Sequence, residues 1–437
     1  MFRGLLRRLV HGTQRTAPER GSEAVAAFAE AHRLQSAGEH AAALARYGAL
    51  LERFPDDLAL NVNVGGLLID LDRPEEALAY LDRAARIAPD EPLVDEHRGR
   101  ACALLQRYGE AEAAERRLLR AHPDEVAAHF RLAHALLARG ALAEGWAEYE
   151  WRLREPGFAW GVRGLPRWDG CAPQGRRLLV IAEQGLGDAI MFARFVPRLA
   201  AQGAQVTLLY RPPLAPLFRS SFAHLGVAVT TEAAGPTGDL QAHIHLLSLP
   251  HVLGVGRADL RAEGAYLAPD PALAARWRAA LAPYGGLRVG LMWGGNPDMP
   301  RDRLRSIPLA AAARFASARD GITWFSLLAD NERKRSLPLP FPMVDLPWAD
   351  FGDTVVLIEA LDLVVSVDTS VAHATGALGR PLWLLAQFEP GWRWMIAGEP
   401  SPWYRGVRMF RPARIGDWEP VVAAVCDALR ERVQAMR

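Results

Sequence analysis

A 34-residue period runs through the first third of the chain and limits what that part can fold into. Three columns share the period: Pro55, Pro89 and Pro123; Ala43, Ala77 and Ala111; and Ala31, Gly65, Gly99 and Ala133. Small residues let two helices approach closely, and proline ends the second helix. Each helix pair leaves an apolar face that only a neighbouring pair can cover. The period therefore predicts a solenoid with units at about 24–57, 58–91 and 92–125, and a fourth unit that begins at 126.

The order small, small, proline resembles the tetratricopeptide repeat. That resemblance implies a concave groove that binds a protein or peptide, and a plain helical bundle is the competing interpretation. Asn61 and Asn63 lie near the start of a first helix, where they either line the groove or serve capping and solvent contact.

The bulk composition excludes several classes of protein. The chain has 437 residues, enough for two or three domains, and a formal net charge of +1. A surface that follows a phosphate backbone usually needs a marked basic excess, so we expect no nucleic-acid partner. The three cysteines form no CxxC pair, which argues against a zinc site or a disulfide framework and favours a reducing, cytoplasmic compartment. No apolar run approaches the roughly 18 residues that cross a bilayer.

Residues 1–22 are predicted to be a basic leader. Phe2, Leu5 and Leu9 can share one helical face, with Arg3 and Arg7 beside it. Either this leader is frayed or it makes a weak contact with a membrane surface.

A change of composition marks a second module. All 13 tryptophans lie at or after Trp146, and a segment rich in proline and glycine follows from 156 to 175. Short apolar runs then alternate with helical segments, which predicts parallel strands and two Rossmann-like halves. We expect repeats over 23–157, a first half over 165–285 and a second half over 286–437. The strands are expected at 177–182, 205–210, 227–231, 243–247, 287–293, 322–328, 361–367 and 381–386.

The first candidate motif is EQGLGD, residues 183–188, between a predicted strand and a helix over about 188–202. Gly185 and Gly187 permit a tight turn and close backbone approach to a ligand. Asp188 is expected at or near the helix N-cap, facing the cleft, where it has either a chemical or only a capping role. Glu183 belongs to the same turn, and the third glycine of a dinucleotide fingerprint is missing.

The second candidate motif, WGGNPDMPRDRLRS at 293–306, follows another predicted strand. Gly294, Gly295 and Asn296 can form a backbone turn, and Arg301, Arg303 and Arg305 bring cations to it, with Ser306 beside the last. Glycine amides and guanidinium groups suit a diphosphate. A solvated charged loop is the alternative.

The third candidate motif begins SVDTSVAH at 366–373. Asp368 or Thr369 is expected to cap a helix whose positive end faces the cleft, and His373 lies one turn later. A nucleoside diphosphate could bind there, although a lone histidine is usually structural. Downstream, WRW at 392–394, which contains Trp392 and Arg393, and SPWY at 401–404 could frame a sugar or base, or pack the cleft edge. His243 and His245 alternate on a strand without nearby carboxylates, so we expect no metal site.

Together these motifs resemble the C-terminal domain of bacterial tetratricopeptide-repeat glycosyltransferases. That domain is similar to the ADP-heptose:lipopolysaccharide heptosyltransferases and, more distantly, to protein O-GlcNAc transferases. The resemblance covers about residues 146–412 and rests on EQGLGDAIMFARF, SLP at 248–250, WGGN with DRLRS, and VDTSVAHATGALGRPLW. A flagellin glycosyltransferase has the same two-module layout.

The resemblance implies a GT-B fold and inverting, metal-independent sugar transfer from a nucleotide-sugar, with no other cofactor. It assigns Asp188 as the base and Arg305 as the phosphate cation, and it places Asp368, Thr369 and His373 in the nucleotide-binding segment. Leu328 and the residues at 385–387 depart from the family pattern. The acceptor is expected to be a protein recruited by the repeats. The alternatives are a glycan- or lipid-directed transferase and a catalytically inactive scaffold.

Overall fold

The structure is a computed structural model that describes residues 21–158, 164–231, 239–260, 264–299, 301–328, 338–347, 350–394 and 401–437. The chain divides into two compact units, residues 1–155 and 156–437. The predicted leader over 1–22 lies outside the described residues except for its last two. Within the described part, no helix is both long and apolar enough to cross a membrane.

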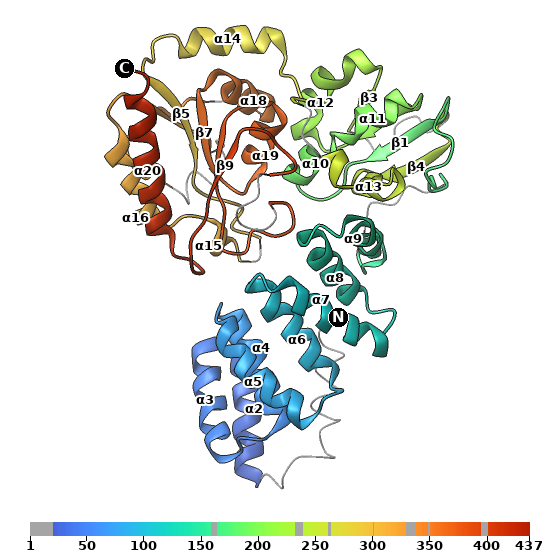
Figure 1. Ribbon diagram of the computed structural model, residues 1–437, viewed down its shortest axis with the longest axis vertical. Helices are drawn as coiled ribbons and strands as arrows, with labels where there is room; N and C mark the ends of the chain where they lie inside the picture. Colours follow the sequence, from blue (N-terminus) through green and yellow to red (C-terminus); the bar gives the residue numbers. More distant parts are fainter. Residues whose placement is uncertain are drawn as a thin grey trace. The chain divides into compact units, whose positions relative to one another are not determined.

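The first unit consists of helices that follow one another in pairs (Figure 1). The pairs begin at residues 22, 58, 92 and 126, and the last three are the predicted unit starts. The helices are α2 (Ser22–Ser36), α3 (His40–Arg53), α4 (Leu58–Asp70), α5 (Pro74–Ile87), α6 (Pro92–Leu104), α7 (Tyr108–Ala121), α8 (Val126–Ala138) and α9 (Leu142–Tyr149), and the 3₁₀ segment η2 (Glu150–Arg154) follows.

The small residues on the first helices of the repeats face a set of buried side chains on the second helices, one in each repeat. Tyr47, Leu81, Glu115 and Tyr149 are spaced by 34 residues and are buried. A Cβ added to Gly65 would lie 2.6 Å from Leu81, and one added to Gly99 would collide with the Glu115 carboxylate. The small column is therefore required by close helix packing. Its charged member, Glu115, stands where the other units have an apolar or aromatic side chain.

A bidentate ion pair accommodates Glu115. Arg131 on α8 donates from Nε to one carboxylate oxygen at 2.7 Å and from Nη2 to the other at 3.1 Å. Glu96 lies 3.8 Å from the same guanidinium. Burial raises the pKa of Glu115 from 4.5 to about 7, although the Arg131 charge and hydrogen bonds lower it.

This raised pKa predicts a pH-dependent stability of the third and fourth repeats. The folded state binds the Glu115 proton more tightly than the unfolded state, so this contribution is fully present below pH 4.5 and is lost as the pH rises to about 7. We expect a fall on the order of 3 kcal/mol in the free energy of opening of α7 and α8. Hydrogen exchange of the full chain, corrected for the intrinsic rate, measures it. Glu115→Gln should remove the slope, and a slope that persists in this variant would contradict the assignment.

Asn61 and Asn63 are both buried on α4. The Asn61 amide donates to the carbonyl oxygens of Pro55 at 2.9 Å and Asp57 at 2.8 Å, and the Asn63 amide donates to that of Ala59 at 2.7 Å. These bonds favour a structural role for both side chains over contact with a bound peptide.

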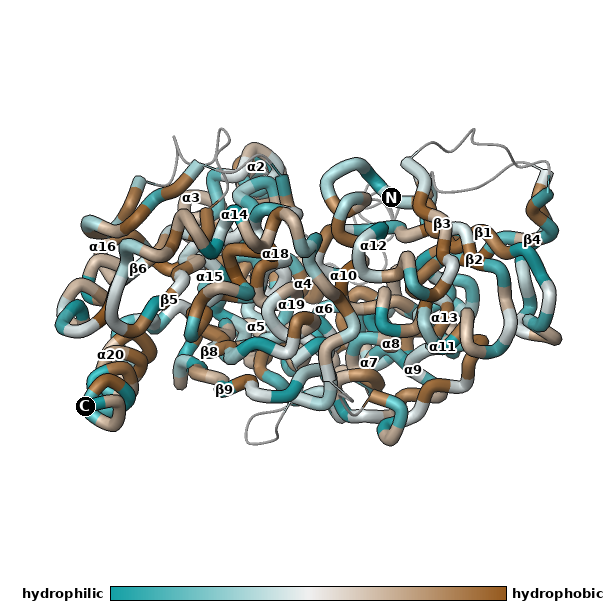
Figure 2. Tube along the Cα trace, turned by 90° about the horizontal axis from the view of Figure 1, so that it is seen from above, coloured by the Kyte–Doolittle hydropathy of each residue, from teal (hydrophilic) through white to brown (hydrophobic). Residues whose placement is uncertain are grey.

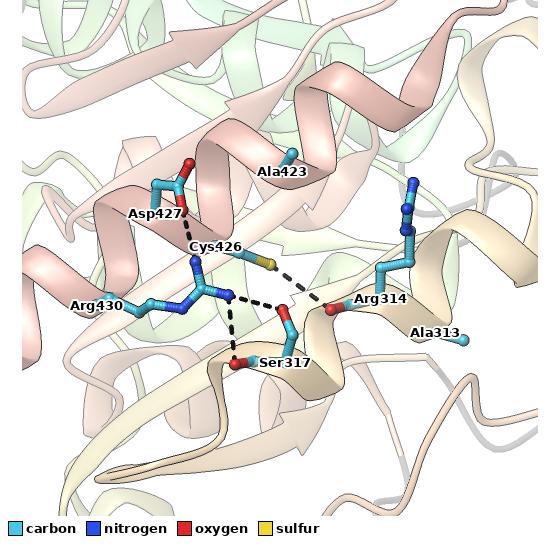
Figure 3. Close-up of a pocket in the computed structure, with 7 residues that line it drawn as sticks. All are labelled: Ala313, Arg314, Ser317, Ala423, Cys426, Asp427 and Arg430. Atoms are coloured by element: carbon cyan, nitrogen blue, oxygen red, sulfur yellow. Dashed lines mark hydrogen bonds and ion pairs between the residues drawn. The ribbon is translucent and has the colours of Figure 1, made fainter.

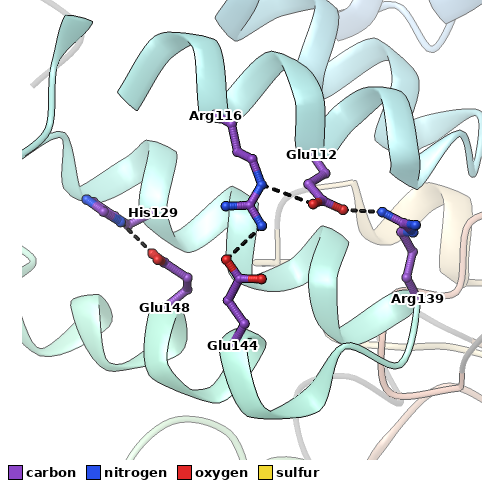
Figure 4. Close-up of polar contacts among 6 residues, drawn as sticks. All are labelled: Glu112, Arg116, His129, Arg139, Glu144 and Glu148. Atoms are coloured by element: carbon purple, nitrogen blue, oxygen red, sulfur yellow. Dashed lines mark hydrogen bonds and ion pairs between the residues drawn. The ribbon is translucent and has the colours of Figure 1, made fainter. Parts of the chain in front are cut away.

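Ion pairs connect the helices of the last two repeats (Figure 4). Arg116 on α7 donates to Glu112 at 3.0 Å and to Glu144 on α9 at 2.7 Å. Glu112 also accepts from Arg139, just after α8. Because most of these side chains are well exposed, each pair contributes only about 0–1 kcal/mol.

The first half of the second unit is built on a parallel four-stranded sheet of order β3-β2-β1-β4. Its strands lie within two residues of the predicted runs: β1 (Arg177–Ile181), β2 (Gln205–Leu209), β3 (Ala228–Thr230) and β4 (Ala242–His245). Its helices are α10 (Leu186–Phe192), α11 (Phe195–Ala201), α12 (Ala215–Phe222) and α13 (Leu249–Val252), followed by the 3₁₀ segment η7 (Arg257–Leu260).

The single helix predicted over 188–202 is two helices. The first, α10, ends at Phe192, and α11 begins at Phe195. Pro197 explains the break, since it cannot donate to the carbonyl of residue 193 and its ring would clash with that carbonyl in a continuous helix.

The second half has a parallel five-stranded sheet of order β6-β5-β7-β8-β9. Its strands are β5 (Leu287–Met292), β6 (Ile322–Ser326), β7 (Leu363–Val367), β8 (Leu382–Leu385) and β9 (Val407–Phe410). Its helical segments are α14 (Pro271–Leu281), α15 (Asp302–Arg305), α16 (Leu309–Ala312), η8 (Ala313–Ala318), α18 (Phe351–Ala360), α19 (Ser370–Ala377) and α20 (Trp418–Gln434). The strand β9 was not predicted, because it is a short edge strand with an exposed or half-exposed side chain at three of its four positions.

Amphipathic character explains the position of α20, the last helix. Hydrophobic and hydrophilic residues alternate along it (Figure 2), and one face, which includes Trp418, Val422 and Leu429, is buried. That face packs on η8 and α16.

Candidate functional site

The second and third motifs leave adjacent strands at the same edge of the five-stranded sheet. Met292 at the end of β5 pairs with Ser366 on β7. Gly294 and Asp368 each follow two residues later, so the two motifs begin side by side at the carboxyl ends of the strands. Ligands of open parallel sheets bind at these ends.

The first motif forms the turn between β1 and α10. Gln184 has a left-handed φ of 70°, Gly185 is the N-cap, and the helix begins at Leu186. Asp188 is therefore the third residue of the helix, within its first turn, so it lies near the N-cap, as predicted, while Gly185 occupies the N-cap itself. The left-handed residue closes the turn early, and a non-glycine residue there is a strained conformation of the kind found at functional sites.

Helix α10 of the first half meets α19 of the second half at Gly187. A Cβ at this position would lie 2.8 Å from Cδ2 of His373 and 3.6 Å from Cα of Ser370. Only glycine permits this approach. The first and third motifs are thus in contact, as expected for two sides of one site.

Asp188 is paired with Arg393, which follows β8. The Arg393 Nε and Nη2 atoms lie 2.7 Å and 2.6 Å from Asp188 Oδ1. The guanidinium also lies 4.6 Å from the ring centroid of Trp392. Trp392 itself is buried and packs against Phe192 and Trp403. Of the two outcomes expected for Trp392, the structure favours packing at the cleft edge.

His373 is enclosed and does not face open space. Its Nδ1 lies 2.9 Å from the Tyr404 hydroxyl, its Nε2 lies 3.5 Å from Asp368 Oδ1, and its ring stacks on Trp394 at 4.9 Å. The carboxylate favours the proton on Nε2, so Nδ1 accepts from the Tyr404 hydroxyl. The expectation that His373 donates to a ligand is not met in this structure, because both ring nitrogens have protein partners.

Asp368 is ionised by its surroundings. Burial raises the pKa of this carboxyl, but His373 and the Arg393 charge lower it more, so the pKa lies below its ordinary value. The next residue, Thr369, is the N-cap of α19 without a side-chain cap bond, and its hydroxyl lies 3.3 Å from that of Ser366. Thr369, one of the two residues expected to cap the helix, therefore occupies the N-cap position, but its side chain makes no capping hydrogen bond.

Asp302 organises the second motif. Its Oδ1 accepts from Arg305 Nε at 3.1 Å and from Nη2 at 2.6 Å, and its Oδ2 accepts from the Ser306 hydroxyl at 2.7 Å. The Ser306 hydroxyl in turn accepts from the Gly295 amide at 2.7 Å. A Cβ at Gly295 would collide with Asp302 and Arg305. The loop is therefore an ordered unit that fixes the guanidinium.

The remaining predicted residues have distinct surroundings. Asn296 is exposed, and its carbonyl and side-chain oxygens accept from the amides of Met299 at 2.9 Å and Asp298 at 3.4 Å. Gly294 is buried in the turn after β5. Glu183 is fully buried, so it is less accessible to a substrate than Asp188, of which 15% of the side chain is exposed.

Tyr266 and Arg194 at the contact of the two halves were not predicted, whereas the aromatic residues at 401–404 were expected to frame a sugar or base or to pack the cleft edge. The Tyr404 ring packs against Gly376, and Tyr266 between the halves donates to the carbonyl of Ile190 at 2.9 Å. The guanidinium of Arg194 lies 5.3–5.9 Å from the ring centroids of Tyr266, Trp403 and Tyr404. Asp302, which the sequence reasoning also missed, had a signal in the sequence, since it precedes Arg305 by three residues in a helical segment.

A cavity of about 460 Å³ lies elsewhere, between η8 and α20 (Figure 3). Its polar groups pair with one another: Arg430 binds Asp427 at 2.5 Å and the Ser317 hydroxyl at 3.0 Å, and Cys426 contacts the Arg314 carbonyl. It contains none of the predicted site residues, so we place the candidate site at the strand ends. Among the residues with described positions, no three His, Cys, Asp or Glu side chains gather as metal ligands.

Comparisons with known proteins match the repeats, and one relative matches most of the chain. Two family models of the tetratricopeptide repeat match residues 34–99 and 97–150. Protein FlbA of Caulobacter vibrioides is 29% identical over 412 residues, which cover 86% of this chain and 68% of that protein. The E. coli ADP-heptose lps heptosyltransferase II has a TM-score of 0.40 at 13% identity, over 59% of this chain and 99% of its own. The MamA protein of Desulfovibrio magneticus RS-1 has a TM-score of 0.30 at 17% identity, over 31% and 76%.

The first unit is therefore a tetratricopeptide-repeat solenoid. The predicted architecture is confirmed: an α-solenoid of these repeats, followed by an α/β fold of two Rossmann-like halves. The plain helical bundle is excluded for the repeat unit.

Proposed function

We propose that the chain is a glycosyltransferase that moves a sugar from a nucleotide-sugar to a protein acceptor recruited by the repeats. One observation carries the proposal. A carboxylate in the first turn of α10, Asp188, pairs with Arg393 of the other half, and the residue before it, Gly187, packs on the start of α19 at the carboxyl ends of the strands. A donor held by one half and an acceptor held by the other would meet there.

The donor side of the proposed site is the second half. Arg305 and Ser306, fixed by Asp302, supply a cation and a hydroxyl for a diphosphate, and the turn at Gly294 and Asn296 is adjacent. The start of α19 at Thr369 supplies backbone N–H groups with partial positive charge. We assign His373 and Asp368 the role of holding α19 in place.

The proposed reaction transfers one proton and breaks one bond. The acceptor oxygen attacks the anomeric carbon while the bond from that carbon to the phosphate oxygen breaks, and the nucleoside diphosphate leaves with both electrons. Asp188 takes the proton of the acceptor, and the configuration inverts because the attack comes from the face opposite the leaving group. Arg305 and the α19 start would stabilise the diphosphate without a metal ion.

Arg305→Ala is expected to weaken nucleotide-sugar binding about 10- to 100-fold, since a hydrogen bond to a charged group contributes about 1.5–3 kcal/mol. Calorimetry measures the affinity. Arg314→Ala is the matched control, because Arg314 is exposed and pairs with Glu419 outside the site. Equal affinity in wild type and Arg305→Ala would remove Arg305 from the donor site.

The acceptor is tested by mass spectrometry of proteins incubated with the chain and a donor, with and without a chelator. The proposal predicts addition of one sugar mass to a protein, which survives chelation. A fragment of residues 164–437 should consume donor but modify the acceptor poorly. Modification of a glycan or lipid alone would favour the second candidate, a heptosyltransferase-like enzyme, and no donor consumption would favour an inactive scaffold.

A further inference from the structure

Two consecutive residues of the second half contact one face of α10 in the first half. Asp188 and Phe192 are four residues apart on this helix, so their side chains share a face. Arg393 pairs with Asp188, and Trp392 packs edge-on against Phe192, with ring centroids 6.1 Å apart at 76°. The Asp188 side chain is therefore held at a contact that covers about one turn of the helix.

The Arg393 guanidinium is fixed by a support that is itself rigid. It stacks on Trp392 at 4.6 Å, and Trp392 in turn contacts Trp403, with centroids 6.0 Å apart at 62°. An arginine that is stacked on a buried indole and also paired with a carboxylate has lost much of its rotational freedom. The guanidinium therefore defines where the carboxylate lies.

The contact distinguishes the two oxygens of Asp188. Arg393 Nε donates to Oδ1 at 2.7 Å, and Nη2 lies 2.6 Å from the same oxygen. The acceptor proton would then go to Oδ2, which lies beside Gly185, 3.9 Å from the position of an added Cβ. Without the guanidinium, rotation about χ2 would exchange the two oxygens.

The Arg393 charge also acts on a carboxylate of its own half. Burial raises the pKa of Asp368, and His373 and then Arg393 lower it. One cation therefore favours the ionised form of Asp368 in its own half and is paired with Asp188 of the other half.

We propose that Arg393 is a positioning residue for Asp188, which turns Oδ2 toward the acceptor when the two halves are in contact. This inference rests on the proposed function, in which Asp188 takes the acceptor proton. The rival role for Arg393 is direct binding of the donor phosphates.

The test uses the full-length chain with Arg393→Gln, Arg393→Lys, Asp188→Asn and the double variant Arg393→Gln/Asp188→Asn. It measures kcat for nucleoside diphosphate release in the presence of acceptor, and donor Kd by calorimetry. Arg393→Gln should lower kcat about 10²-fold, the usual effect of a misplaced catalytic group, with donor Kd unchanged. Arg393→Lys keeps the charge without the two-donor geometry and should restore kcat only in part.

The double variant decides between the two roles. If Arg393 acts through Asp188, the double variant is no slower than Asp188→Asn alone. If the two losses multiply, or donor Kd rises in Arg393→Gln, Arg393 contacts the donor and the proposal is overturned. Arg198→Gln is the control, because Arg198 forms an exposed pair with Asp259 at 2.9 Å in the first half, and its kcat should equal that of wild type.

Two further outcomes are decisive. If Arg393→Gln does not fold, Arg393→Lys replaces it: a lower kcat at constant Kd supports the positioning role, and an unchanged kcat overturns it. If the wild type consumes no donor, the proposed function is wrong, and so is the role of Arg393 that rests on it. An active wild type with an unaffected Arg393→Gln overturns the role of Arg393 alone.

Discussion

Asp188→Asn is expected to fold and bind donor like the wild type, and to turn over about 10²- to 10⁴-fold more slowly. An acceptor hydroxyl is a poor nucleophile at neutral pH, so loss of the group that accepts its proton raises the barrier directly. Asparagine has nearly the same shape, and its Oδ1 can still accept from Arg393, so the contact between α10 and the second half should persist. Turnover and donor Kd are measured on the same preparation.

Glu183→Gln is the matched comparison for Asp188→Asn. Both substitutions replace a carboxylate by its amide in the same turn, but Glu183 is fully buried whereas Asp188 is partly exposed. We expect the Glu183 variant to retain more activity. Normal turnover by Asp188→Asn together with loss in Glu183→Gln would make Glu183 the base, and normal turnover by both would show that the proton goes elsewhere.

The second large effect is expected in the repeats above pH 7, where Glu115 is ionised: Glu115→Leu should lower the free energy of opening of α7 and α8 by about 3 kcal/mol. Removing one partner of a buried ion pair leaves the other charge without compensation, which typically costs about 3–5 kcal/mol. We expect the lower end of this range because 24% of the Arg131 side chain is exposed to water and Glu96, 3.8 Å away, still compensates part of its charge. Hydrogen exchange of α7 and α8 in the full chain measures the change.

The preceding repeat supplies the rescue. Leu81 occupies the column of Glu115, and His97 occupies that of Arg131, both 34 residues earlier. Glu115→Leu/Arg131→His therefore transfers a pair that the chain already uses and should recover most of the lost stability. If the double variant is no more stable than Glu115→Leu, or Glu115→Leu is as stable as wild type, the ion pair is not what holds these repeats together.

Much of the fold could be predicted because its periods are strict. The 34-residue columns determine which residues lie at helix contacts, and apolar runs such as LVVSV can only be buried parallel strands. Two features were missed for physical reasons. The break within 188–202 depends on Pro197, and the edge strand β9 has too few buried side chains to be recognised.

The candidate site was predictable only in part. Asp188, Gly187 and Gly294 could be placed from the sequence because each lies in a glycine-containing turn at a strand end. The conformation of such a turn depends mainly on neighbouring residues. Arg393 pairs with Asp188, and Tyr404 and Asp368 contact His373. The paired residues lie up to 205 positions apart in the chain, and their local sequence does not predict these contacts. For the same reason the sequence could not show that both ring nitrogens of His373 are already engaged.

The most direct test of the account is the rate at which the full-length chain releases nucleoside diphosphate from each member of a panel of nucleotide-sugars, with Asp188→Asn measured beside it. The account predicts that wild type consumes at least one donor in the presence of a protein acceptor and a chelator, and that Asp188→Asn is slower by about 10²-fold or more. Release from no donor above the rate of Asp188→Asn would contradict it.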